Sequence, residues 1–420
     1  MAEKHTPFYP AEILLPAAGI PAETWACVAC DQYTSQPEYW EKAEEIVGEN
    51  PSTLRLMLPE CYLGESEARI PVIHGAMRDY LKEGKLLPAV QHGFVLCRRT
   101  TAHGARLGLV GVVDLEEYDY AAGSEPPVRP TEQTIAERLP PRLKIRRGAP
   151  VELSHILILI DDPERTVLEP LAEEAENLRR LYDFELMQGG GRLEGFAVED
   201  SRRISAVEKA LADLRRKGGE HPLLLAVGDG NHSLATAKAC WNEIRETLSE
   251  KERKTHPARF ALCEIENIHD RALLFEPIHR LITGTTPEEL YDCWETYASE
   301  RGMKLEEEGE GHTFQMVIRK DEYRVVVKNP EGEIPCETIQ LFLDHFLASH
   351  PEASIDYIHG AQTLRTLATK KDAVGFILPE IDKHSFFEDV RKLGVLPRKT
   401  FSMGEAEEKR FYMECRKIEI

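Results

Sequence analysis

The chain has 420 residues, 42 % of them hydrophobic, which is enough for two or three domains around a large core. It carries 52 Lys and Arg against 73 Asp and Glu, a net charge of −21. This excess of negative charge argues against a general nucleic-acid surface, so DNA binding is the least favoured of the possible functions. The charge balance does not exclude a local basic pocket for a small anion. With no apolar run of 18 residues and no signal peptide, we expect a cytoplasmic protein without membrane contact.

The N-terminal part is rich in Pro and aromatic residues, and its predicted elements are short. The Cys27–Cys30 CxxC has no second CxxC and no nearby ligand His, so packing is favoured over zinc or redox chemistry; the nine cysteines are expected to be free thiols of a reducing cytosol. Residues 125–130 should form an extended connection, and Thr131 is expected to cap a helix over 131–138. In the first 115 residues we expect helices at 38–47 and 71–83, and strands at 93–98 and 107–115.

The middle of the chain alternates apolar runs and amphipathic segments. Residues 155–160 (HILILI) are typical of a strand buried on both faces, and 169–183 favour an amphipathic helix. A hairpin is expected over 184–198, around the Gly189–Gly191 triplet. The remaining predictions here are a helix at 204–217, a strand at 223–227, a helix from 234, and a strand at 259–265.

The composition changes near Asn267, which sets an expected boundary at about residue 270. We therefore expect a ligand-binding domain at 1–270 and a C-terminal domain at 271–420 that closes the site. The irregular alternation of strands and helices indicates an α/β or α+β fold, with a mixed sheet flanked by helices and a smaller C-terminal α+β region. The C-terminal predictions are helices at 287–301 and 337–350, and hairpin strands at 314–318 and 323–327.

The most informative segment is the polar turn between the strand at 223–227 and the helix that follows it. It consists of Gly228, Asp229, Gly230, Asn231, His232 and Ser233. Glycines allow close backbone approach, and a helix start binds anions through its N–H groups and dipole. Asp229 could hold a metal ion or a hydroxyl, and His232 could donate to a phosphate oxygen. The structural alternative is an ordinary turn capped by Ser233 or Asn231.

Other polar groups stand out for lack of an obvious packing role, although each also has a structural interpretation. Asp31 and Glu132 are candidate carboxylates for an acceptor hydroxyl, or else simple caps. Asn50 begins an Asn-Pro turn. Basic residues gather in two places, where they could neutralise phosphates or pair with the acidic surface. The first comprises Arg138, Arg142, Lys144, Arg146 and Arg147, and the second Arg398 and Lys399.

In this order the motifs resemble those of the bacterial and archaeal "domain of unknown function 1015" family, over nearly the whole chain. Asp229–Ser233 matches the family's Asp-Gly-His-His-Arg signature, and Pro130–Thr134 its Pro-His-Glu-x-Thr segment. Cys30-Asp31, Asn50-Pro51, Arg142 and Pro397–Thr400 match further family segments. The chain departs at Ser233, where Arg is common, and at Thr131, where His is common. The first departure removes a bidentate phosphate contact that Arg142 or Lys399 would have to replace.

The turn also resembles that of the ParB/sulfiredoxin-like superfamily, where it lies on nucleotide phosphates and where some members phosphorylate free serine. The resemblance implies Mg²⁺- and nucleotide-dependent phosphoryl transfer, from ATP or ADP, to a small hydroxylated metabolite, with free L-serine as the first candidate. Asp229 would hold Mg²⁺, His232 would stabilise the transferred oxygens, and Glu132 or Asp31 would take the hydroxyl proton. Arg142 and Lys399 would offset transition-state charge. The alternative is a regulatory protein that binds a nucleotide or metabolite without chemistry; a homodimer is kept open.

Overall fold

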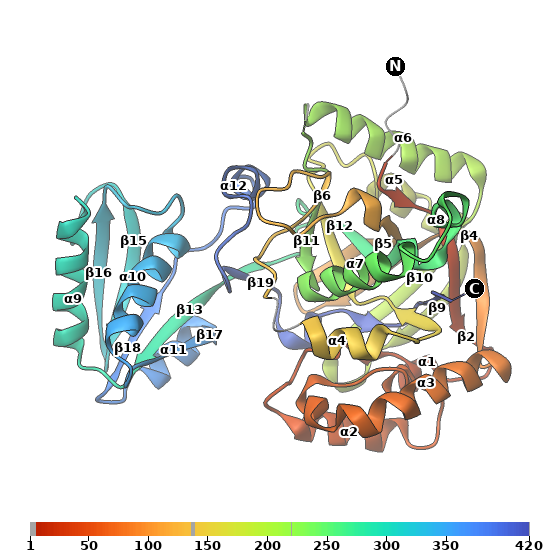
Figure 1. Ribbon diagram of the computed structural model, residues 1–420, viewed down its shortest axis with the longest axis horizontal. Coiled ribbons are helices and arrows are strands. Elements are labelled where there is room, and N and C mark those ends of the chain that lie inside the picture. The colour runs from red at the N-terminus through yellow and green to blue at the C-terminus, as the bar shows by residue number, and fades with distance from the viewer. Residues whose placement is uncertain (1–5, 136–138, 220, 420) are drawn as a thin grey trace. The chain divides into compact units, whose positions relative to one another are not determined.

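The computed structural model describes residues 6–135, 139–219 and 221–419 (Figure 1). The chain forms two units: Met1–Leu273 together with Gly404–Ile420, and Leu274–Met403. The division therefore differs from the expected 271–420 domain, because the last segment returns to the first unit. Its strands β20 (Phe411–Tyr412) and β21 (Cys415–Lys417) pair with strands of that unit, β3 (Cys27–Val28), β2 (Ala11–Pro16) and β7 (Val151–Leu153).

The first unit is built on a twelve-stranded mixed sheet, which confirms the predicted fold class. The main path is β6-β11-β8-β12-β5-β4-β2-β21-β7, with β1 beside β5 and the β9–β10 hairpin beside β4. Two pairs are parallel, β11 with β6 and β12 with β8. The further bounds are β1 Phe8–Tyr9, β4 Leu86–Thr101, β5 Gly104–Asp114, β6 Val128–Pro130, β8 Ile156–Ile160, β9 Arg179–Glu185, β10 Arg192–Val198, β11 Leu225–Asp229 and β12 Phe260–Asn267.

Successive residues of the central strands enter two different apolar clusters, as strand geometry requires. In β4, Val95 belongs to one cluster and Leu96 to the other; in β12, Leu262 and Cys263 divide in the same way. Helices α2 and α3 cover the first face and α6 and α7 the second (Figure 1). The helices of this unit are α1 Ala22–Trp25, α2 Pro37–Val47, α3 Ser66–Lys82, α4 Leu139–Arg146, α5 Glu169–Glu173, α6 Ser201–Lys217, α7 Asn231–Arg245 and α8 Glu250–Thr255.

The helix expected over 169–183 is wrong. Helix α5 ends at Glu173, and Arg179–Glu185 forms β9. Tyr182 and Phe184 are buried, while Leu181 and Asp183 are only partly buried and Glu185 is exposed, so residues 181–185 have the period of two that suits a strand. Pairing with β10, which itself pairs with β4, overrides the local helical pattern. The predicted hairpin around the glycine triplet is confirmed, with its first strand beginning earlier than expected.

The prediction of a helix that begins at Thr131 is also wrong for the described residues, because residues 131–135 are not helical. Residues 136–138 lie outside the described residues, and α4 begins at Leu139. Thr131 is fully buried and donates its hydroxyl to the Val227 carbonyl at 2.6 Å, so it extends the β6–β11 pairing instead of capping a helix.

The second unit confirms the predicted smaller C-terminal α+β region. Its antiparallel sheet has the order β14-β16-β15-β18-β13-β17, with β19 beside β13. A core around Trp294, Phe314 and Phe342 fills the space between sheet and helices. The elements are β13 Phe275–Thr283, α9 Pro287–Glu300, β14 Lys304–Glu306, β15 His312–Ile318, β16 Asp321–Lys328, α10 Pro335–Ser349, β17 Ser354–His359, α11 Ala361–Leu367, β18 Ala373–Ile377, α12 Phe386–Leu393 and β19 Phe401–Met403.

Among the described residues, no helix combines the length and apolar character that crossing a membrane would take.

Candidate functional site

The polar glycine turn joins β11 to α7. β11 ends at Asp229, Gly230 adopts a left-handed φ of 83°, and α7 begins at Asn231. Gly230 is therefore the N-cap, so the expected cap at Ser233 or Asn231 is wrong. A Cβ at Gly230 would lie 3.0 Å from His155 Cδ2, so both backbone conformation and space favour glycine. The Leu234 N–H donates to the Gly230 carbonyl, and the amides of residues 231–233, which precede it, form the first turn of α7.

The segment that follows β6 packs directly on this turn. The Thr131 N–H donates to Asn231 Oδ1 at 3.1 Å, and the Ile135 N–H donates to His232 Nε2 at 3.2 Å. Glu132, partly buried, lies between these two anchors, so the structure places it beside the turn. Because Nε2 of His232 accepts a hydrogen bond, any donation from this imidazole to a ligand would come from Nδ1.

Asp229 is paired with a lysine that the sequence analysis did not single out. Its Oδ2 lies 3.3 Å from Nζ of Lys409, and its Oδ1 accepts from the Gly230 N–H at 2.9 Å. The Lys409 side chain is only 12 % exposed. Burial would raise the pKa of Asp229, but Lys409 and His155 outweigh burial and hold that pKa below its ordinary value. Asp229 is therefore an ionised carboxylate between two cations.

His155 is the second residue that the sequence analysis did not identify as a site residue. It immediately precedes β8, and its Nε2 lies 3.7 Å from Asp31 Oδ2. Burial would lower the pKa of His155, yet Asp31 above all, with smaller contributions from Cys30 and Asp229, raises it to about 10. The imidazole is consequently a buried cation at neutral pH, held between Asp31 and Asp229.

Tyr412 links the N-terminal and C-terminal segments at this point. Its hydroxyl contacts Nδ1 of His155, accepts from the Cys30 N–H at 3.0 Å, and lies 3.3 Å from Cys30 Sγ. This network fixes Asp31, the next residue, against the imidazole. Cys30 and Tyr412 lie 382 positions apart in the sequence, so this network ties the C-terminal segment to the N-terminal one.

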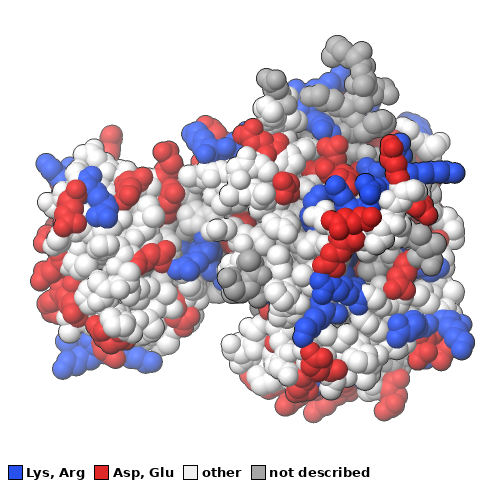
Figure 2. Space-filling model, viewed as in Figure 1, with Lys and Arg blue, Asp and Glu red and all other residues white. Residues whose placement is uncertain are grey.

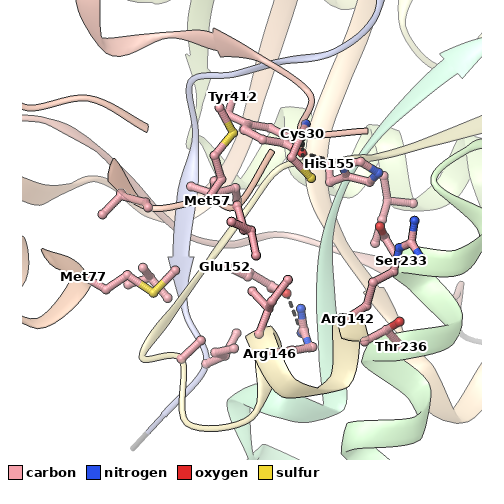
Figure 3. Close-up of a pocket in the computed structure, with 18 of the residues that line it drawn as sticks. Cys30, Met57, Met77, Arg142, Arg146, Glu152, His155, Ser233, Thr236 and Tyr412 are labelled. Carbon is pink, nitrogen blue, oxygen red and sulfur yellow. Dashed lines mark hydrogen bonds and ion pairs between the residues drawn. The ribbon is translucent and has the colours of Figure 1, made fainter. Parts of the chain in front are cut away.

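A pocket opens beside this network (Figure 3). Cys30, His155, Arg142, Ser233 and Thr236 lie on its polar side, and Met57 and Met77 lie on the opposite, apolar side. The structure therefore brings the predicted residues Arg142 and Ser233 to the same cavity. Arg142 forms an ion pair with Glu60, and its neighbour Arg146 pairs with Glu152 at 2.6 Å.

Other predicted residues have structural partners elsewhere. Lys399 belongs to the second unit, where its carbonyl accepts from Arg280 Nη1 at 3.0 Å, so it is not part of the first unit's pocket. Asn50 donates to the Val47 carbonyl just after α2. Of the basic cluster, Lys144 pairs with Glu67 and Arg147 with Glu243 at the surface. Figure 2 shows this mixture of basic and acidic side chains over α4. Arg138 lies outside the described residues.

The described residues offer few ligands for a resident metal ion. Within residues 6–135, 139–219 and 221–419 there is no group of three or more His, Cys, Asp and Glu that could hold a metal ion. Mg²⁺ that arrives with a nucleotide needs only one or two carboxylates, because phosphates and water complete its octahedron. Asp229 fits that smaller requirement, provided that its contact with Lys409 opens.

No curated protein matches the chain. Solved structures that resemble it include free serine kinase in complex with AMP (12 % identity, 73 % of this chain and 91 % of that chain, TM-score 0.40). A conserved hypothetical protein from Pyrococcus furiosus (11 %, 72 % and 97 %, TM-score 0.36) and a truncated SbnI from Staphylococcus aureus (10 %, 70 % and 82 %, TM-score 0.36) are also similar. At these TM-scores the likeness carries no functional conclusion, and the ParB/sulfiredoxin resemblance stays a prediction. The family model described as "Protein of unknown function (DUF1015)" matches residues 14–346, so the chain belongs to that family.

Proposed function

We propose that this protein transfers a phosphoryl group from ATP or ADP to a small hydroxylated metabolite, with free L-serine as the first acceptor to test. The observation that carries the proposal is the gathering of two acid–cation pairs, Asp229–Lys409 and Asp31–His155, around the first turn of α7. Such a turn binds anions through its N–H groups, and nearby cations strengthen that binding.

The residues divide into phosphate-binding and acceptor-binding groups. The amides at residues 231–233, with Lys409 and Arg142, would hold the donor's terminal phosphates, a role that the common family Arg would otherwise share at Ser233. His232 would add a hydrogen bond from Nδ1. Phosphoryl transfer is catalysed mainly by positioning and charge, so this arrangement needs no covalent intermediate.

Asp31 or Glu132 would orient the acceptor hydroxyl. The hydroxyl oxygen attacks the donor's terminal phosphorus, the bond from that phosphorus to its bridging oxygen breaks, and the hydroxyl proton passes to the carboxylate. ATP thereby becomes ADP, or ADP becomes AMP. Bound Mg²⁺ would neutralise charge on the phosphates, with Asp229 as its protein ligand.

The test uses the full chain with Mg²⁺, ATP or ADP, and L-serine within a panel of hydroxylated metabolites, followed by ³¹P NMR. We expect a phosphomonoester to form, and Asp229→Asn or His232→Ala to reduce its rate at least a hundredfold. Nucleotide binding without product from any acceptor in the panel would refute the catalytic proposal.

A second candidate, a nucleotide- or metabolite-binding regulator without chemistry, is favoured by Ser233 and by the Ile135 contact that occupies Nε2 of His232. It predicts stabilisation by a nucleotide of about 2.7 kcal/mol at a hundredfold excess over Kd, with no turnover. Thermal melts with and without ADP measure this directly. No shift with any nucleotide would exclude this candidate too.

A further inference from the structure

The pocket beside the α7 turn has two chemically different sides. At one side Ser233 and Thr236 of α7 lie near Arg142, and His155 closes that end (Figure 3). The opposite side is formed by buried or partly buried apolar groups that belong to the core of the α2–α3 face. The six that define it are Met57, Leu58, Leu63, Met77, Val151 and Ile418.

Several polar side chains around the pocket already bond one another or the backbone. Arg142 pairs with Glu60, and Glu152 is shared by Arg146 and Arg416 at 2.6 and 2.7 Å. Thr236 donates its hydroxyl to the His232 carbonyl at 2.7 Å. A nucleobase needs hydrogen-bond partners along its edge, and the apolar wall opposite these groups offers none. An alkyl or other nonpolar group makes no such demand.

The apolar wall can also adapt to its occupant. Met57 and Met77 have unbranched, polarisable side chains that fill irregular space. Ser233, in the first turn of α7, lines the polar side of the same cavity together with Arg142 and His155. One ligand can therefore place an anionic group at the turn and a nonpolar group against the methionines.

We propose that this pocket binds the nonpolar part of the phosphoryl acceptor, so that the natural substrate is a hydroxylated metabolite with an aliphatic chain of several carbons. The assignment rests on the proposed function for the position of the phosphate, but the apolar subsite can be tested without turnover. Free L-serine has no such chain, so within the proposed substrate class the structure favours longer acceptors.

The probes are n-alkyl phosphates from methyl to octyl, titrated into the full-length protein by calorimetry. We expect affinity to rise about fourfold for each added methylene until the pocket is full, as burial of one CH₂ group predicts. Equal affinity for methyl and octyl phosphate would overturn the inference.

Two variants that fill the pocket and one control variant test whether the dependence on chain length arises in this pocket. Leu63→Trp adds bulk at a partly exposed wall position, and Ala149→Leu adds it beside the end of α4. Both should abolish the dependence on chain length while methyl phosphate binds as before. Val72→Trp adds bulk to α3 at a side chain 70 % exposed and outside this pocket, and should change nothing. Circular dichroism confirms folding; if one filling variant fails to fold, the other decides.

Three further outcomes separate the proposals. If ADP displaces octyl phosphate and the filling variants weaken ADP and octyl phosphate by the same factor, the nucleobase occupies the pocket and the inference is wrong. Chain-length dependence without turnover of any acceptor supports the apolar subsite and refutes the proposed function alone. Turnover of L-serine with no chain-length dependence refutes the subsite alone.

Discussion

The two ends of β8 carry similar residues but use them differently. At its start His155 pairs with Asp31, and just beyond its end Asp161 pairs with His269, at 3.7 and 2.8 Å. Both histidine side chains are 13 % exposed. After the end of β8, Asp162 accepts from the backbone of Thr166 and Val167, and so closes a turn. Asp162 therefore satisfies local backbone groups, while Asp161 pairs with the His269 imidazole.

At the start of β8 the acids satisfy cations instead. Asp31 and Asp229 flank His155, Lys409 adds a second positive charge, and the first turn of α7 lies beside them. Asp229 also accepts from the Gly230 N–H of its own turn, but here two acids and two cations gather beside the first turn of a helix. We therefore interpret the start of β8 as the functional end and the far end as structural. An Asp–His pair is informative only with its surroundings.

The largest expected effect concerns how the start of β8 is held. Arg410 ion-pairs with Glu264 and Glu414 and donates to the carbonyl of Ser154, next to His155. Arg410→Met leaves two buried carboxylates without their cation and should lower the free energy of unfolding by about 3–5 kcal/mol. Urea denaturation measures this loss. Arg192→Met, at a half-exposed pair with Asp183, should cost only about 0–1 kcal/mol; equal losses would contradict the contrast.

The far end of β8 is tested by Asp162→Ala. The Asp162 side chain is fully buried, and its removal leaves the Thr166 and Val167 amides without their acceptor. We expect a loss of about 1–3 kcal/mol in unfolding free energy. Nucleotide affinity, measured by calorimetry on the folded variant, should stay within twofold. A tenfold loss of affinity would show that this end also serves ligand binding.

The turn itself can be compared with an unrelated glycine. Gly230→Ala and Gly123→Ala both force a left-handed residue to carry a Cβ, at φ of 83° and 78°, at a cost of about 1–2 kcal/mol each. Only Gly230 has a neighbour, His155, that the new Cβ would press against. Thermal melts should therefore show the larger loss for Gly230→Ala, and anion binding should weaken in that variant alone. Equal losses of stability and of anion binding in the two variants would contradict the close packing of His155 against Gly230.

A smaller but specific effect concerns the charge on His155. Its pKa is raised from the ordinary 6.5 to about 10, so the charged form is stabilised in the fold. This contribution to stability is fully present below pH 6.5 and is lost as the pH rises through about 10. NMR titration of the imidazole should show this pKa in the wild type and a lower one in Asp31→Asn. An unchanged value in the variant would mean that Asp31 does not hold the imidazolium.

Sequence periodicity predicted most strands and helices because their faces are strongly apolar, as in 155–160 and 204–217. It failed at 169–183, where pairing with a distant strand decided the structure. Of the site, the turn at 228–233 and Asp31 could be found from local chemistry. His155 was read as the first residue of a buried strand, and Lys409 and Tyr412 lie in a segment that returns from the far end of the chain. Nothing local marks such contacts, so the sequence points to Lys399, whereas the lysine that pairs with Asp229 is Lys409.

The central claim is tested most directly by the rate of phosphomonoester formation in a matched pair of variants at the two ends of β8. The assay uses Mg²⁺, ATP or ADP, and the best acceptor of the panel, with Asp31→Asn and Asp161→Asn at equal protein concentration. We predict that Asp31→Asn lowers the rate by about a hundredfold to ten-thousandfold, while Asp161→Asn stays within twofold of the wild type. Equal rates in the two variants would contradict the assignment of the start of β8 as the catalytic end.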